Sequence, residues 1–229
     1  MENLVAMLTA NDYTRTDRAF SKPLIVHAVA GAGKTSLIRR FMKENAQVSA
    51  QTHGTPDPPN LTRKMITKVT APKSNHFNIL DEYCAFPLKG SWDACFADPL
   101  QHPDFAQEPH FIKETTHRFG PETCELIKSL GIPICPLGPS QVLTIKGLFE
   151  GEIFGKVICL DSDIAALACR HRIPISQPKQ TIGLEFPTVT VLSSLPLSQV
   201  EDVTGVYISL TRHTKELHVR APPETHSTA

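Results

Sequence analysis

A short glycine-containing segment near the N-terminus constrains this chain more than any other part of its sequence. Residues 24–26 form an apolar run, and Gly31 and Gly33 follow it, directly before Lys34-Thr35. Glycine adopts the left-handed backbone conformations that let successive N–H groups point at one anion. Lys34 can reach the outer phosphates of a nucleotide, and the Thr35 hydroxyl can bind Mg²⁺. The segment therefore predicts a strand, a phosphate-binding loop and a helix, with a nucleoside triphosphate as the ligand.

The expected nucleotide contacts cover the whole loop and the start of a helix expected over residues 35–44. They are Ala28, Val29, Ala30, Gly31, Ala32, Gly33, Lys34, Thr35 and Ser36. Ala28 stands where the general phosphate-loop pattern has glycine. A methyl group is tolerated there if the backbone is extended, so we interpret Ala28 as variation at a phosphate site. The alternative is a chance glycine turn before a helix.

The composition gives no bulk preference for a charged partner. Among the 229 residues, Lys+Arg and Asp+Glu both number 23, so net charge does not argue for nucleic acid. The six cysteines form no Cys-x-x-Cys pair, which favours buried reduced thiols over zinc or disulfides. No apolar run approaches the roughly 18 residues of a membrane span, and the N-terminus lacks the basic start of a secretory signal. We therefore expect a cytosolic protein without direct membrane insertion.

Two further apolar runs lead into polar residues. Residues 77–80 precede Asp81-Glu82, and residues 94–97 precede the short segment Asp98-Pro99-Leu100-Gln101. In a parallel α/β sheet, ligands bind beyond the carboxyl ends of the strands. We therefore expect Asp81 to hold the metal ion, Glu82 to activate water, and Gln101 to contact the γ-phosphate or the attacking water. The alternative for the acidic pair is a cap on the following helix.

The second half of the chain places two arginines beside apolar elements. Arg118 follows a strand expected over residues 111–116, and Arg212 lies on a helix expected over residues 200–214. An arginine held on a packed element can stabilise the negative charge that grows on phosphoryl oxygens during transfer. The alternative for each arginine is a surface salt bridge.

Taken together, these segments resemble the superfamily 1 RNA helicase core of plant and animal positive-strand RNA viruses. Seven segments match the motifs of that family in order: 31–35 (motif I), 50–57 (Ia), 81–82 (II), 97–101 (III), 117–120 (IV), 183–190 (V) and 210–213 (VI). Ala28 and Ala97 stand where glycines are common in the wider superfamily. The resemblance covers residues 24–219. It implies the P-loop NTPase fold, with two RecA-like α/β domains, mainly parallel sheets, no large inserts, and ATP with Mg²⁺ between the domains.

The same resemblance implies a domain organisation and a set of RNA contacts. The expected domains are an N-terminal helical extension (1–22), a first RecA-like domain (23–110), a second RecA-like domain (111–220) and a disordered tail (221–229). The candidate RNA contacts are Arg15, Arg18, Thr52, His53, Thr181 and Gly183. Such binding would be electrostatic and independent of sequence.

The short stretches on either side of the motifs favour a free-standing core, similar to the triple gene block protein 1 family of potexviruses and carlaviruses. That similarity implies NTP hydrolysis, transport of single-stranded viral RNA through plasmodesmata in the host cytoplasm, and suppression of host RNA silencing. The implied partners are further copies of the chain, the viral coat protein, the other movement proteins and host silencing factors. One alternative is an RNA- and protein-binding adaptor whose NTPase activity is incidental. A small-molecule kinase shares the loop but leaves residues 117–120 and 210–213 unexplained. Duplex unwinding stays open, because domains without inserts leave little room for a strand-separating element.

Overall fold

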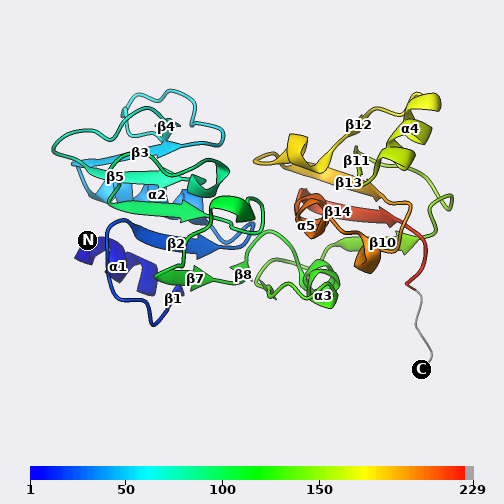
Figure 1. Ribbon diagram of the computed structural model, residues 1–229, viewed down its shortest axis with the longest axis horizontal. Coiled ribbons are helices and arrows are strands. Elements are labelled where there is room, and N and C mark those ends of the chain that lie inside the picture. Colours follow the sequence, from blue (N-terminus) through cyan, green and yellow to red (C-terminus); the bar gives the residue numbers. More distant parts are fainter. Residues whose placement is uncertain (225–229) are drawn as a thin grey trace. The chain divides into compact units, whose positions relative to one another are not determined.

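The computed structural model describes residues 1–224 and divides into two compact units, each with a sheet of its own (Figure 1). The division falls between Thr115 and Thr116. Both units combine a mainly parallel sheet with short helices, so the expected α/β class is confirmed. Parallel strands need crossover connections, and these crossovers supply the helices.

The first unit is built on a seven-stranded sheet of order β1-β7-β2-β6-β5-β3-β4, which is parallel except for the pair β1 and β7. Its strands are β1 (Thr14–Arg15), β2 (Leu24–Ala28), β3 (Val48–Thr52), β4 (Thr67–Lys68), β5 (Phe77–Asp81), β6 (Ala94–Ala97) and β7 (Phe111–Lys113). Its helices are α1 (Glu2–Thr9) and α2 (Lys34–Glu44), with 3-10 turns at Tyr83–Ala85 and Pro103–Phe105.

The central strands of this sheet are buried on both faces. Every residue of β2 and β6 is buried, as expected for parallel strands that read as continuous apolar runs. One core cluster packs Ile25 of β2 and Leu80 of β5 against Trp92 and Tyr83. Because β2, β6 and β5 are parallel neighbours, their carboxyl ends meet at one edge of the sheet. This edge is where the candidate site lies.

The second unit is built on a five-stranded parallel sheet of order β10-β14-β13-β11-β12. Its strands are β10 (Val142–Lys146), β11 (Lys156–Cys159), β12 (Ile175–Ser176), β13 (Phe186–Leu192) and β14 (His213–Arg220). A separate two-stranded sheet pairs β8 (Thr115–Thr116) with β9 (Cys135–Pro136). The helices are α3 (Pro121–Ser129), α4 (Ser162–Arg170) and α5 (Val203–Leu210), with 3-10 turns at Pro178–Thr181 and Leu197–Gln199.

Three expectations about elements need correction. The strand expected to open the second domain supplies β7 instead, because Phe111 pairs with Val26 of β2 in the first sheet. The helical extension expected over residues 1–22 is helical only in α1, and β1 then joins the first sheet. The helix expected over residues 200–214 is α5 alone, so Arg212 lies beyond its end.

The cysteines are buried free thiols, as expected, at four of six positions. Cys84, Cys95, Cys124 and Cys159 are buried free thiols, whereas Cys135 and Cys169 are exposed. Among residues 1–224, every helix is too short or too polar to cross a lipid bilayer. Of the tail that was expected to be disordered, residues 225–229 lie outside the described residues.

Candidate active site

The phosphate-binding loop takes the predicted form. Strand β2 ends at Ala28, and helix α2 begins at Lys34, one residue earlier than expected. Gly31 and Gly33 between them have φ values of 75° and 89°, in the left-handed region that side chains disfavour. A Cβ at Gly33 would meet no atom within 4 Å, so backbone conformation, and not crowding, requires glycine there.

The side chain of Lys34 bonds back to the start of this loop. Its ammonium nitrogen donates to the carbonyl of Ala28 at 2.8 Å and to that of Val29 at 3.3 Å. The side chain is buried, and its partners are neutral backbone oxygens. Both of these bonds are made to uncharged acceptors, while the charge of Lys34 also acts on the nearby Asp81 carboxyl. The Ala28 carbonyl therefore helps to position the lysine.

Thr35 and the acidic pair meet beside the loop. The Thr35 hydroxyl donates to Oδ2 of Asp81 at 3.4 Å, and the Glu82 N–H donates to Oδ1 at 3.1 Å. Asp81 ends β5 and is buried. Burial and, to a smaller extent, the charge of Glu82 raise the pKa of Asp81 to about 7. Glu82 itself has a φ of 54°, an uncommon conformation for a residue with a Cβ and one that is frequent at functional sites.

The donor set at this corner fits Mg²⁺. A hydroxyl and a carboxylate oxygen are hard ligands of the kind that Mg²⁺ takes, and this ion usually uses one or two such groups together with substrate phosphates. Thr35, in the first turn of α2, and Asp81, at the end of β5, supply these groups. The roles assigned to them from the sequence therefore stay consistent with the geometry.

Gln101 is held by a residue to which the sequence assigned no role of its own. Its side-chain amide donates to Oδ2 of Asp98 at 2.8 Å, and its backbone N–H donates to the Asp98 carbonyl at 3.1 Å. The Leu100 N–H donates to the other carboxylate oxygen. Asp98 is fully buried directly after β6, so it fixes the position of Gln101 at the carboxyl edge of the sheet.

A buried histidine–tyrosine pair adds a connection that the sequence did not reveal. The hydroxyl of Tyr83 lies 2.8 Å from Nε2 of His27, accepts the Gln107 N–H at 2.9 Å, and the two rings stack at 5.9 Å. Burial lowers the pKa of His27 to about 4, so the ring is neutral near pH 7. The pair ties the strand before the loop to the residue after motif II. The only sequence signals were a polar residue inside an apolar strand and a tyrosine next to the acidic pair.

Arg118 is anchored within the second unit. Its Nη1 donates to the Thr211 carbonyl at 2.9 Å, and its Nη2 forms an ion pair with Glu185 of motif V. Its backbone N–H donates to the Thr116 hydroxyl at 3.2 Å. The side chain keeps 18% of its surface exposed. Three motifs therefore meet at this arginine.

Arg212 is more deeply enclosed than the sequence suggested. It is 2% exposed, and its guanidinium donates to the Ile208 carbonyl at 3.1 Å, the Thr181 carbonyl at 3.4 Å and the Thr211 hydroxyl at 2.9 Å. The Thr211 hydroxyl in turn donates to the Tyr207 carbonyl of α5. Helix α5 ends there because the polar residues that follow bond back to its last turn, which leaves Arg212 between α5 and β14.

His213 is buried beside these arginines. Its ring stacks on Phe119 at 5.6 Å, its Nδ1 lies 3.0 Å from the Leu210 carbonyl, and its Nε2 lies 3.2 Å from the Thr123 hydroxyl. Burial and the charge of Arg118 lower the pKa of His213 to about 4, although the Leu210 carbonyl acts in the opposite direction.

This shift predicts a pH dependence of stability. Between about pH 6.5 and pH 4, the unfolded state binds a proton at His213 that the folded state excludes, so stability falls as pH falls. The loss amounts to at most about 3 kcal/mol. Replacing His213→Gln should lower the melting temperature near neutral pH but reduce its further decrease towards about pH 5. If the melting temperatures of both proteins fell by the same amount across that pH range, the result would contradict this assignment.

The candidate RNA contacts have mixed environments. Arg15 lies 4.1 Å from the Phe20 ring centroid and donates to the carbonyls of Thr16 and His110, and Arg18 donates to the carbonyl of Glu108. Thr181 is fully buried with its hydroxyl on the Pro178 carbonyl, and Gly183 has a φ of 75°. These contacts serve the local structure of each segment.

Motif Ia offers a more open surface. The buried Thr52 hydroxyl accepts the Gly54 N–H at 2.9 Å, which shapes the turn after β3. His53 then packs on Phe86, with ring centroids 4.9 Å apart, and Phe86 is 56% exposed. The sequence did not single out Phe86, although exposed aromatic rings are the usual platforms for unpaired bases.

Comparison with known proteins agrees with this geometry. Residues 24–221 match the family described as the viral superfamily 1 RNA helicase core domain. The movement and silencing protein TGBp1 of Plantago asiatica mosaic potexvirus is 50% identical over 228 residues, which cover 97% of this chain and 98% of that protein. The proteins of the same name from Papaya mosaic potexvirus and Potato virus X (strain CP) are 41% and 36% identical, and the matches cover 99% of each.

Experimental structures share the fold at low sequence identity. Arterivirus nonstructural protein 10, a helicase in complex with DNA, superposes with a TM-score of 0.61 at 17% identity over 87% of this chain. The match covers 61% of the arterivirus protein. A crystal structure of arterivirus nonstructural protein 10 gives a TM-score of 0.53, also at 17% identity. This chain belongs to the viral superfamily 1 RNA helicase family, together with the potexvirus proteins named TGBp1.

Proposed function

We propose that this protein is an RNA-binding NTPase of the helicase type, which moves viral RNA between host cells and suppresses RNA silencing. The observation that carries the NTPase proposal is the grouping of Lys34, Thr35, Asp81 and Gln101 at the carboxyl ends of adjacent parallel strands. Movement and silencing rest on the names of relatives that align with this chain over nearly their full length. The host cytoplasm and plasmodesmata are the corresponding location.

In the proposed reaction, the backbone N–H groups around Gly31 and Gly33 and the ammonium of Lys34 bind the phosphates. Thr35 and Asp81 hold Mg²⁺, which neutralises charge on the phosphate oxygens when it is bound. Glu82 accepts the proton of the attacking water.

Other side chains complete this chemistry. Gln101, oriented by Asp98, hydrogen-bonds the γ-phosphate or the water. Arg118 and Arg212 are the candidates for the cations that stabilise the transition-state charge. Both arginines already donate to backbone carbonyls, which holds their guanidinium groups in defined directions.

A turnover assay tests the reaction class. The purified protein should convert ATP to ADP and inorganic phosphate with water as the only phosphoryl acceptor. Removal of Mg²⁺ with EDTA should stop this reaction. Thr35→Ala should raise the Mg²⁺ concentration needed for half-maximal turnover, whereas Thr9→Ala, at an exposed position of α1, should not. A phosphorylated small molecule as the product would indicate a kinase instead, and the absence of turnover in all conditions would reject the proposal.

RNA binding is proposed to use the motif Ia surface. Phe86→Ala should weaken binding of single-stranded RNA by roughly 5- to 150-fold, since stacking of one base on an aromatic ring contributes about 1–3 kcal/mol. Phe149→Ala removes another exposed ring, in the second unit, and should leave affinity unchanged. Fluorescence anisotropy with a labelled oligonucleotide at fixed salt measures both, because the electrostatic part of the affinity depends on ionic strength. Equal affinities for the two variants would remove Phe86 from the interface.

Association with further copies of the chain, the viral coat protein, the other movement proteins and host silencing factors belongs to the same proposal. It rests on the family to which the relatives belong.

A further inference from the structure

Residues 137–141 lie outside every motif, yet they pack backbone to backbone against motif IV. A Cβ at Gly138 would stand 2.7 Å from the Phe119 carbonyl oxygen, and a Cβ at Gly120 would stand 2.4 Å from the Pro139 carbonyl oxygen. Both distances are shorter than any real Cβ contact, so glycine at each position is what permits the two backbones to approach. The motif IV segment is therefore clamped by residues 137–141.

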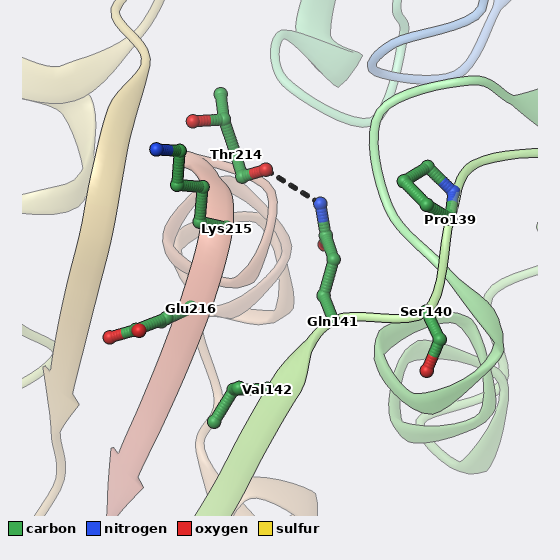
Figure 2. Close-up of a pocket in the computed structure, with 7 residues that line it drawn as sticks. All are labelled: Pro139, Ser140, Gln141, Val142, Thr214, Lys215 and Glu216. Carbon is green, nitrogen blue, oxygen red and sulfur yellow. Dashed lines mark hydrogen bonds between the residues drawn. The ribbon is translucent and has the colours of Figure 1, made fainter.

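Gln141 extends this clamp to motif VI. Its side-chain amide nitrogen donates to the Arg118 carbonyl at 2.9 Å and to the Thr214 carbonyl at 2.7 Å, and its amide oxygen lies 3.0 Å from Nε2 of His213. In Figure 2 the side chain reaches from the start of β10 across to Thr214 at the start of β14. Because both backbone partners are carbonyl acceptors, the NH₂ group of the Gln141 side chain must face them and its oxygen must face His213.

Gln141 bonds to the backbone at or near the two candidate arginines: to the carbonyl of Arg118 itself and to that of Thr214, two residues after Arg212. Arg118 is bonded through its own carbonyl, while its side chain donates to the Thr211 carbonyl. Arg212 lies between Thr211 and Thr214 in the chain. On one side, the Arg118 guanidinium bonds to the Thr211 carbonyl. On the other side, Gln141 joins the Thr214 carbonyl to the Arg118 carbonyl. The result is a closed set of hydrogen bonds that sets the spacing of the two arginines.

We propose that Gln141 is a positioning residue for Arg118 and Arg212, an inference that rests on the NTPase activity proposed above. Stabilising a transition state requires the cations at fixed places before reaction, and misplacement by about 1 Å can cost roughly 100-fold in rate. Gln141 bonds to the backbone of Arg118 and to that of Thr214, two residues after Arg212, and it touches no reacting group. Its loss should therefore lower kcat and leave the KM for nucleotide, which depends on the phosphate loop, nearly unchanged.

The surroundings of Gln141 allow this role to be separated from a purely structural one. The residue lines an open pocket of about 480 Å³ together with Pro139, Ser140, Val142, Thr214, Lys215 and Glu216. Truncation of its side chain therefore leaves no sealed apolar cavity, and water can reach the two carbonyls and bond to them. We expect the melting temperature to change little.

The experiment measures steady-state ATP turnover by the full chain and its variants. Gln141→Ala should lower kcat roughly 10-fold with KM within about twofold. Gln141→Glu keeps the shape but loses both donated bonds, so it should lower kcat at least as much. Ser140→Ala, in the same pocket, should match the wild type. Wild-type kcat in both Gln141 variants would overturn the proposal.

A double-mutant cycle shows whether Gln141 acts through Arg118. On an Arg118→Ala background, Gln141→Ala should lower kcat by clearly less than 10-fold, because coupled residues are not additive, and the remaining loss is the part that acts through Arg212. The full 10-fold loss on that background would contradict positioning of Arg118.

A measurement without turnover keeps this inference distinct from the proposed function. The guanidinium NMR signals of Arg118 and Arg212 should shift or broaden in Gln141→Ala and stay unchanged in Ser140→Ala. Such changes in a protein that hydrolyses no ATP would support the positioning and reject the NTPase. Unchanged signals in an active protein would reject the positioning and retain the NTPase.

Discussion

Lys34→Ala is expected to abolish nucleotide hydrolysis, with a loss in kcat/KM of roughly 10³-fold or more, since the lysine is the positive side chain of the phosphate loop. The fold should survive, because the bonds that are lost join Lys34 only to carbonyls of its own loop at Ala28 and Val29. Steady-state release of phosphate is the measurement, with circular dichroism as the check on folding.

Lys43→Ala is the matched control for this variant. Lys43 is an exposed lysine in the last turn of the same helix, so its removal changes the net charge equally while leaving the loop intact. It should hydrolyse ATP at the wild-type rate. A folded Lys34→Ala protein with undiminished turnover would exclude the loop as the phosphate site. Normal virus spread with a folded, inactive Lys34→Ala protein would instead favour an adaptor whose NTPase is incidental.

Arg118→Ala should lower kcat by roughly 10³-fold while the KM for nucleotide changes little, because arginine cations that act in phosphoryl transfer contribute about 10³–10⁵ to the rate. Its guanidinium already joins motifs V and VI through Glu185 and Thr211. Arg118→Lys keeps the charge but cannot reproduce the two-sided bonding, so it should restore only part of the rate.

Arg212 needs a different variant. It is almost fully buried and donates to Ile208 and Thr181 carbonyls, so Arg212→Ala would leave buried acceptors unsatisfied and lower stability as well as kcat. Arg212→Lys is the informative change. It should lower kcat clearly while it changes the melting temperature only slightly. Arg170→Ala, at an exposed position of α4, should be neutral in both. Loss of stability with undiminished kcat in the folded fraction would reduce Arg212 to a structural role.

The sequence predicts the elements that carry the first half of the candidate site, because the signals for them are local. A glycine turn, a lysine and a threonine are adjacent in the chain, and each acidic or amide residue follows its own apolar strand. The end of a strand is visible in one sequence, and parallel order then brings the ends together. The strands predicted from the apolar runs 24–26, 77–80 and 94–97 are confirmed as β2, β5 and β6.

Contacts between distant segments were not predictable in this way. Phe111 starts a strand that could belong to either sheet, and only its pairing with Val26 places it in the first. No glycine or proline follows Leu210 closely to mark the end of a helix, so the expected helix is longer than α5. In the structure the Thr211 hydroxyl ends the helix by bonding back to the Tyr207 carbonyl. The bridge made by Gln141 depends on three chain segments, and no spacing pattern records it.

The most direct test of an RNA-dependent NTPase is ATP turnover by the purified wild-type protein, with and without single-stranded RNA, at constant salt. We expect measurable Mg²⁺-dependent hydrolysis that saturating RNA increases several-fold, with the increase lost at high ionic strength as RNA dissociates. Hydrolysis that RNA leaves unchanged at saturating binding, or the absence of hydrolysis with RNA bound, would contradict it.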